Sequence, residues 1–72
     1  GKVMGGRISA VNGRVIKLDR VADAAAGDRL ILNLPSGASQ SRTIQAVNGE
    51  SVTVTTAYSE TPQAEAVWVV ES

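Results

Sequence analysis

The seven carboxylates are the side chains whose chemistry would support catalysis or metal binding. They are Asp19, Asp23, Asp28, Glu50, Glu60, Glu65 and Glu71. None belongs to a Glu-x-x-His pair or to an Asp-x-Asp-x-Asp-Gly calcium loop. Asp19 and Asp23 bracket an expected turn, where they are either solvated turn residues or ligands of a weakly held cation. Glycosidase chemistry needs two facing carboxylates in a cleft, and a core this small leaves little room for one.

Two residue types with versatile chemistry are absent from the sequence, namely cysteine and histidine. Their absence excludes thiolate and imidazole metal sites, and also a Ser-His or Cys-His nucleophile pair. The segment Met4-Gly5-Gly6 is followed neither by a P-loop Lys-Ser/Thr pair nor by a helix. We interpret it as a flexible entry to the first strand or as a close backbone approach at a barrel corner. The sequence therefore predicts no catalytic, cofactor-binding or metal-binding residue, and no enzyme.

The charge balance is neutral, with 7 Lys and Arg against 7 Asp and Glu. A neutral chain has no long-range field that would gather nucleic acid or anionic lipid. Barrels that bind single strands combine a basic groove with stacked aromatic rings, and only Tyr58 and Trp68 are aromatic here. We therefore expect no nucleic acid, while a small oligonucleotide- or peptide-binding barrel stays as the alternative. No apolar run approaches the ~20 residues that a membrane span requires.

The tetrapeptide Ala-Val-Asn-Gly occurs twice, at residues 10–13 and 46–49. Around it, residues 7–18 align with residues 43–54 without a gap, and the apolar positions correspond. Each copy indicates a β-hairpin, because arms of alternating hydrophobicity flank an Asn-Gly turn. The repeat is either the reuse of a favourable turn or an internal duplication of a strand-turn-strand unit.

The apolar pattern of the first copy also predicts a register. A two-residue loop of Asn12 and Gly13 would point Ile8 and Ile16 to opposite faces of the sheet. A three-residue loop that begins at Val11 and ends in a left-handed glycine brings Ile8 opposite Ile16. We therefore predict this bulged loop in both hairpins, with positive φ at both glycines. The predicted turn residues are Asn12, Gly13, Asn48 and Gly49, together with Pro35 and Gly37.

The remaining strands are expected at residues 28–35, 42–47, 51–57 and 66–71, with a polar loop at residues 58–65. Residues 21–27 form one turn or a loop, since they are too few for a helix. Six short strands joined by hairpins predict an all-β fold in a single domain of residues 1–72, either a small antiparallel barrel or a two-layer β-sandwich. The predicted core comprises Ile8, Ile16, Leu18, Leu30, Leu32, Leu34, Ile44, Val52 and Val54, with one face of the last strand.

The last strand is apolar on both faces, with Val67 and Val69 on one side and Trp68 and Val70 on the other. Trp68 is either part of the core or an anchor against a neighbouring domain or subunit, where tryptophan is enriched. The candidate interface residues are Trp68, Val70 and Tyr58. Because the chain ends directly after this strand, we interpret it as a module of a longer polypeptide.

The order of these features resembles a segment of the tail tip attachment protein, or host specificity protein, of lambda-like phages. The resemblance covers nearly the whole chain, from "GRISAVNGRVIKLD" to the terminal "VWVVES". Besides the short hairpins, the shared features are Gly27–Asp28 before an apolar strand, Leu34–Gly37, Ser41–Thr43, and a Pro62 loop before Val67–Val69.

This resemblance implies a non-enzymatic structural role in a phage or prophage tail tip, where the protein takes part in host attachment. It implies a trimeric parent made of many small β domains, assembled in the bacterial cytoplasm and located at the tip of the virion tail. Its partners would be neighbouring domains of the same chain and other tail tip proteins. Receptor contact in the family lies near the far C-terminus, whereas this segment is similar to an interior one. No catalytic or ligand residue carries over.

Overall fold

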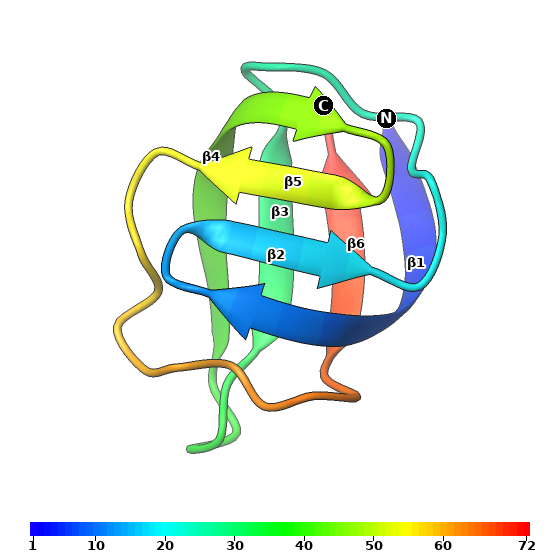
Figure 1. The fold of residues 1–72 in the computed structure, drawn as a ribbon. Coiled ribbons are helices and arrows are strands. Elements are labelled where there is room, and N and C mark those ends of the chain that lie inside the picture. Colours follow the sequence, from blue (N-terminus) through cyan, green and yellow to red (C-terminus); the bar gives the residue numbers. More distant parts are fainter.

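Six antiparallel strands form the sheet drawn in Figure 1. They are β1 (Lys2–Asn12), β2 (Val15–Leu18), β3 (Arg29–Asn33), β4 (Ser39–Asn48), β5 (Ser51–Val54) and β6 (Val67–Glu71). The computed structural model describes the backbone of residues 1–72 and the side chains of residues 1–2 and 5–72. The strand order is β1-β2-β5-β4-β3-β6, and β6 pairs with β1. This closed barrel confirms the all-β prediction and decides between barrel and sandwich.

The two Asn-Gly hairpins have a register that differs from the prediction. Asn12 pairs with Val15, so the loop contains only Gly13 and Arg14. Gly13 has φ 58, as predicted, whereas Arg14 has no positive φ. This pattern fits a type II′ turn, which places glycine at the first central position. The predicted three-residue loop is therefore wrong, because Val11 and Asn12 are paired strand residues and the loop consists of Gly13 and Arg14.

A β-bulge allows the hairpin with this shorter loop to keep its apolar residues on one face. Ile8 pairs with Leu18 but Ala10 pairs with Lys17, so the register shifts at Ser9. One extra residue moves the following side chains to the other face of the sheet, which restores the alignment that a plain two-residue turn would lose. Ile8 and Ile16 are consequently both buried, as predicted, although they are not cross-strand partners.

The second hairpin repeats this geometry at the corresponding positions. Its register shifts between Ile44 and Ala46, as the first register shifts between Ile8 and Ala10. Gly49 has φ 60, within two degrees of Gly13. The two copies of the sequence repeat are therefore two copies of one bulged hairpin, with the asparagines as the last residues of β1 and β4.

The three-residue loop with a left-handed glycine occurs instead between β3 and β4. The carbonyl of Leu34 accepts a hydrogen bond from the Gly37 amide at 2.8 Å, and the Leu34 amide donates to the Ala38 carbonyl at 2.7 Å. Gly37 has φ 93. Pro35 suits the first central position of this turn because its φ is already restricted. The predicted turn roles of Pro35 and Gly37 agree with this geometry.

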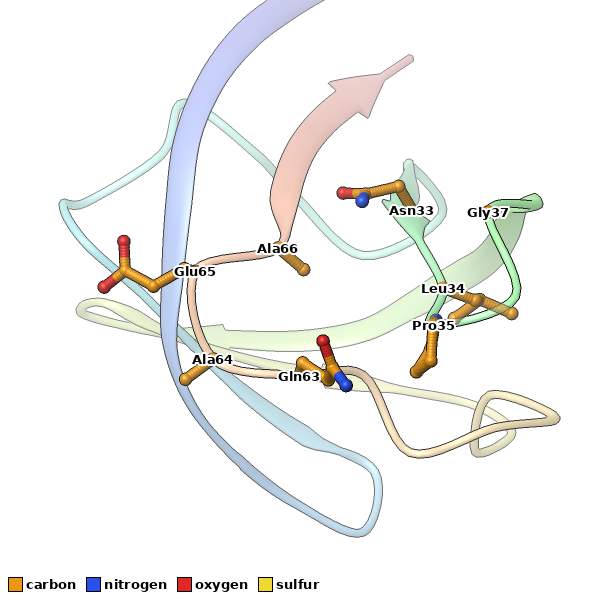
Figure 2. Close-up of a pocket in the computed structure, with 8 residues that line it drawn as sticks. All are labelled: Asn33, Leu34, Pro35, Gly37, Gln63, Ala64, Glu65 and Ala66. Carbon is orange, nitrogen blue, oxygen red and sulfur yellow. The ribbon is translucent and has the colours of Figure 1, made fainter.

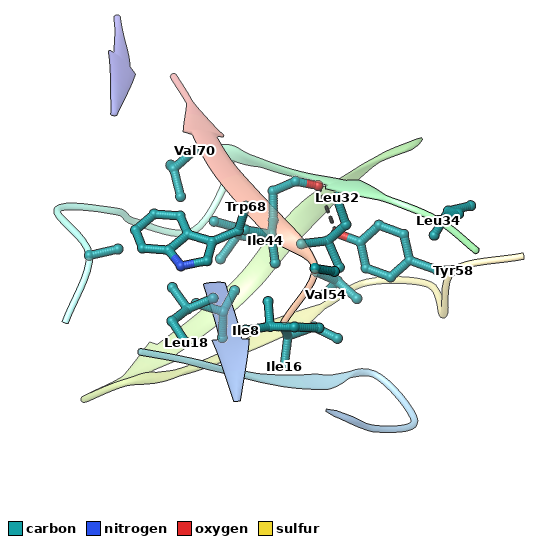
Figure 3. Packing of buried hydrophobic residues seen from close by; sticks show 14 residues of the cluster. Ile8, Ile16, Leu18, Leu32, Leu34, Ile44, Val54, Tyr58, Trp68 and Val70 are labelled. Carbon is teal, nitrogen blue, oxygen red and sulfur yellow. Dashed lines mark hydrogen bonds between the residues drawn. The ribbon is translucent and has the colours of Figure 1, made fainter. Parts of the chain in front are cut away.

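The core fills the barrel. All nine predicted aliphatic residues are buried, each with at most 3% of its surface exposed. Alternation along the strands explains this, because every second residue of a strand faces the interior. Figure 3 shows Trp68 and Tyr58 among these aliphatic side chains. Burial of each large apolar side chain stabilises the fold by about 1.5–3 kcal/mol before chain entropy is considered.

Candidate functional site

One cavity lies at an end of the barrel, between the β3–β4 turn and the loop that leads into β6 (Figure 2). Its volume is about 360 Å³. The lining residues come from two short segments, Asn33–Leu34–Pro35 with Gly37, and Gln63 to Ala66. Leu34 is buried at the core and the other turn residues are exposed, so the cavity is a gap between two loops above the core.

The chemistry of this cavity is limited. Its only ionisable lining residue is Glu65, whose carboxylate points away from Leu34 and Pro35 in Figure 2. The Asn33 side-chain oxygen accepts a hydrogen bond from the Val67 amide at 2.6 Å. The Asn33 side chain therefore connects β3 to the start of β6. Acid–base catalysis needs a positioned proton donor and acceptor, and this lining offers no such pair.

A second cluster surrounds the exposed Asp19 and connects β1 with β6. One carboxylate oxygen accepts the Arg7 amide at 2.8 Å, and the other accepts the Trp68 indole N–H at 3.0 Å. The Arg20 guanidinium lies 5.3 Å from the centre of the Trp68 ring. The hydrogen bond from the Arg7 amide, followed by that from Trp68, holds the pKa of Asp19 below its ordinary value. Asp19 therefore links β1, β6 and the segment after β2.

Two glycines make room for this cluster. Gly5 and Gly6 lie where the β1–β6 register shifts, between the pairs Met4–Val69 and Arg7–Val67. A Cβ on Gly5 would come within 2.1 Å of the Trp68 carbonyl oxygen, and a Cβ on Gly6 within 2.0 Å of the Asp19 carboxylate. Of the two interpretations left open for this segment, close backbone approach is the one observed. The segment lies within β1 and is not a phosphate-binding loop before a helix.

Tyr58 forms the corresponding contact on the other side of the barrel. Its hydroxyl donates to the Leu30 carbonyl at 2.7 Å, drawn as a dashed line in Figure 3. Burial raises the pKa of Tyr58 above its ordinary value. The Arg42 guanidinium lies 5.7 Å from the centre of the Tyr58 ring, and its Nε donates to the Ala57 carbonyl at 3.1 Å. The polar tip of this ring is thus satisfied inside the barrel.

The predicted interface residues require a correction. Trp68, Val70 and Tyr58 expose 0%, 1% and 7% of their surface, so their side chains belong to the core and offer no free surface to a partner. The even-numbered residues of β6 face the interior, and its outer face carries Val67, which is 39% exposed, and the partly buried Val69. The sequence showed both faces as apolar and contained no signal that chose between them.

Three of the other six carboxylates also have structural partners. Asp28 accepts the Ala25 amide at 2.9 Å, and Glu60 accepts the Ser36 hydroxyl at 2.7 Å. Glu71 forms an ion pair with Arg29 at 3.1 Å, and the hydrogen bond from Arg29 lowers the pKa of this carboxyl. Among the described residues no group of three or more His, Cys, Asp or Glu side chains is placed to hold a metal ion.

The described part of the chain contains no helix that is long and apolar enough to cross a membrane. Comparison of the chain with family models, with curated proteins and with solved structures found no match.

Proposed function

We propose that this chain is a non-enzymatic structural module of a phage or prophage tail tip protein, which contributes packing within the tip assembly that attaches to the host. The observation that carries the proposal is the resemblance in the order of turns, strands and loops along nearly all 72 residues. The proposed partners are neighbouring domains of the same chain and other tail tip proteins. The parent assembly would be a homotrimer at the tip of the virion tail.

The chemistry of the barrel supports a structural role. Asp19, Asp28, Glu60 and Glu71 are engaged in contacts that hold loops and strands together. The two aromatic rings of the sequence, Tyr58 and Trp68, are buried. A single-strand-binding barrel needs exposed rings on which bases stack, and the alternative of an oligonucleotide-binding module is therefore less well supported.

The two ends of the described chain are adjacent in space. The start of β1 and the end of β6 lie side by side, since Lys2 pairs with Glu71 (Figure 1). The Ser72 amide donates to the Gly1 carbonyl at 2.8 Å, and the Gly1 amino group donates to the Ser72 hydroxyl. Domains whose ends meet at the surface tolerate insertion into another domain. The proposed contact with neighbouring domains would therefore involve one side of the barrel at both ends.

The proposal is tested on particles from the strain that encodes the chain. Antibodies raised against the purified barrel should label the distal end of the tail in negatively stained electron micrographs. Antibody preincubated with the free barrel is the control, and it should leave the tails unlabelled. Label on the capsid, or absence of peptides of this chain from purified particles in mass spectrometry, would contradict the proposal.

A second measurement addresses the binding alternative. The ¹⁵N-labelled barrel is titrated with a decamer of thymidine and, separately, with an extended apolar peptide. A structural module should show no saturable shift of its amide signals. Saturable shifts confined to one contiguous face would favour an autonomous binding module instead.

A further inference from the structure

The sequence repeat becomes a two-fold relation in space. Strands β2 and β5 belong to different copies of the repeat, and Ile16 pairs with Val52, which is its own counterpart 36 positions later. The backbone hydrogen bonds on either side of this pair are also equivalent, because the two-fold rotation that exchanges the two halves converts one into the other. The Leu18 amide donates to the Glu50 carbonyl at 2.8 Å, and the Val54 amide donates to the Arg14 carbonyl at 2.9 Å.

The relation extends to the third strand of each copy, although the sequences there no longer align by eye. The Gly27 amide donates to the Ile44 carbonyl at 2.9 Å, and the Glu65 amide donates to the Ile8 carbonyl at 3.0 Å. Gly27 and Glu65 both have positive φ, 94 and 74. Each half of the chain is therefore one β-β-β unit. The first half is residues 1–36, with β1 to β3, and the second half is residues 37–72, with β4 to β6.

Neither half closes a sheet alone. Of the six strand pairings in the barrel, only β1–β2 and β4–β5 lie within a half, and the other four join the two halves. Each half thus presents the surfaces that the other half covers, and the covalent link between them is the turn from Leu34 to Ala38. Figure 1 shows this turn projecting beyond one end of the barrel.

We propose that two copies of this chain exchange halves. In the exchanged dimer the first half of one copy forms a barrel with the second half of the other copy, and the turn between β3 and β4 opens into a linker. Every ladder of the barrel is remade in this dimer, and only the bonds of the turn are lost. Domain swapping is a low-cost route to a dimer for this reason. The inference does not depend on the proposed tail tip role.

The short turn decides which form prevails. It holds the two halves at an effective concentration in the millimolar range, so the closed monomer predominates when copies are dilute. Exchange becomes favoured where the local concentration of copies approaches this effective concentration, or where the closed monomer is destabilised. The partner that the structure assigns to each half is consequently a second copy of this chain.

Two full-length variants with complementary damage test the proposal. Ile16→Asp places a charge in the core from the first half, and Val52→Asp does so from the second half. Both sites are fully buried, and an unpaired buried charge unfolds a domain of this size. When the variants are mixed, exchange yields one barrel made only of undamaged halves. With ¹⁵N on the Ile16→Asp chain, dispersed amide signals should return for residues 37–72, at up to about half of the total barrel population.

The matched control mixes Ile16→Asp with Leu18→Asp. Both changes lie in the first half, so no exchanged barrel is undamaged and no dispersed signals should appear. Failure of the complementary pair to exceed this control at millimolar concentration would overturn the proposal.

A second variant does not depend on core damage. Deletion of Ser36 and Gly37 removes two of the three residues between Leu34 and Ala38, whose hydrogen bond closes the turn, and this strains the reversal from β3 to β4 within one copy. Short hinge loops favour swapping. The mass from light scattering should double, with the dispersed amide spectrum of the barrel retained. A variant that stays monomeric, folded or unfolded, would overturn the proposal.

Discussion

The two halves of the barrel share one backbone plan but hold it together with different side chains. In each half, the segment between the second and third strands crosses to the third strand of the other half. Residues 19–28 reach β6 through the Asp19 carboxylate, which accepts the Trp68 indole N–H. Residues 55–66 reach β3 through the Tyr58 hydroxyl, which donates to the Leu30 carbonyl. The same crossing is thus held by an exposed carboxylate in one half and by a buried phenol in the other.

The difference begins with the size of one side chain. Trp68 and Leu30 pair with Leu32 and Val70 respectively, and occupy equivalent places in β6 and β3. The strand beside Leu30 carries Arg42 opposite it, whereas the strand beside Trp68 carries the Gly5–Gly6 bulge. The indole therefore occupies space that a side chain from β1 would need. The turns and ladders are the same in the two halves, whereas the packing of the side chains around these two positions differs.

Replacement of Gly5 is expected to have the largest effect of the changes that test this difference between the halves. A Cβ there would lie 2.1 Å from the Trp68 carbonyl oxygen and 2.2 Å from its ring, so β1 and β6 must separate. We expect Gly5→Ala to lower the free energy of unfolding by about 3 kcal/mol or more, the upper range for overpacking. Chemical denaturation followed by Trp68 fluorescence measures this change.

The control for this prediction is Arg42→Ala in the second half. This position already has a Cβ, and the change removes the contact with the Tyr58 ring and the hydrogen bonds to the Ala57 and Ser41 carbonyls. Its cost should be about 1 kcal/mol. Equal costs for the two variants would show that the glycine is not required by Trp68.

The buried hydroxyl of Tyr58 provides the second test. Tyr58→Phe keeps the ring but removes the donor to the Leu30 carbonyl, and we expect a loss of about 1–2 kcal/mol at neutral pH. The wild-type chain should also lose stability in alkali. Because burial raises the pKa of Tyr58, the folded chain keeps a proton that the unfolded chain releases above about pH 10. Stability is fully present below that pH and falls as the pH rises toward the folded pKa.

Denaturation curves between pH 8 and pH 11 separate these two effects. The alkaline decline assigned to Tyr58 should be absent from Tyr58→Phe. A decline of the same size in both proteins would assign it to other groups.

The sequence predicted the fold better than it predicted the details that depend on contact between distant strands. Alternation along each strand identified the nine aliphatic core residues, because period-two burial is a local property. The bulge at Ser9 was missed, since the same apolar pattern is satisfied either by a three-residue loop or by a two-residue loop with a bulge. Neither alternative for Asp19, a solvated turn residue or a ligand of a weakly held cation, included its contacts, because Arg7 and Trp68 are near it only in the folded chain.

The contact made by Asp19 gives a third and smaller expected effect. Its pKa is lowered in the folded state, so its contribution to stability is present above about pH 4 and is lost as the pH falls through the folded pKa. Asp19→Asn retains one carbonyl acceptor, so either the Arg7 amide or the Trp68 indole loses its partner. The variant should therefore be less stable than wild type at pH 7, and the difference should shrink toward pH 2.

Thermal unfolding of both proteins from pH 7 to pH 2 measures this convergence. Glu71 also has a lowered pKa, so the wild-type chain and the variant should share part of the acid decline. A stability difference that stays constant across this range would contradict a role for the ionised carboxylate.

The smallest expected effect is a gain in stability, and it concerns the residue just before β6. Glu65 has φ 74, and its counterpart in the first half is Gly27, with φ 94. A side chain in the left-handed region costs roughly 1–2 kcal/mol, and a glycine adds roughly 0.5–1 kcal/mol of chain entropy to the cost of folding. We expect Glu65→Gly to raise the free energy of unfolding by about 0.5–1 kcal/mol, although glycine usually destabilises. The reverse comparison is Gly27→Ala, which should destabilise although a Cβ there would meet no atom within 4 Å. If Glu65→Gly destabilised the barrel in urea denaturation, the two positions would not be backbone equivalents, and the two-fold relation would not extend to the third strands.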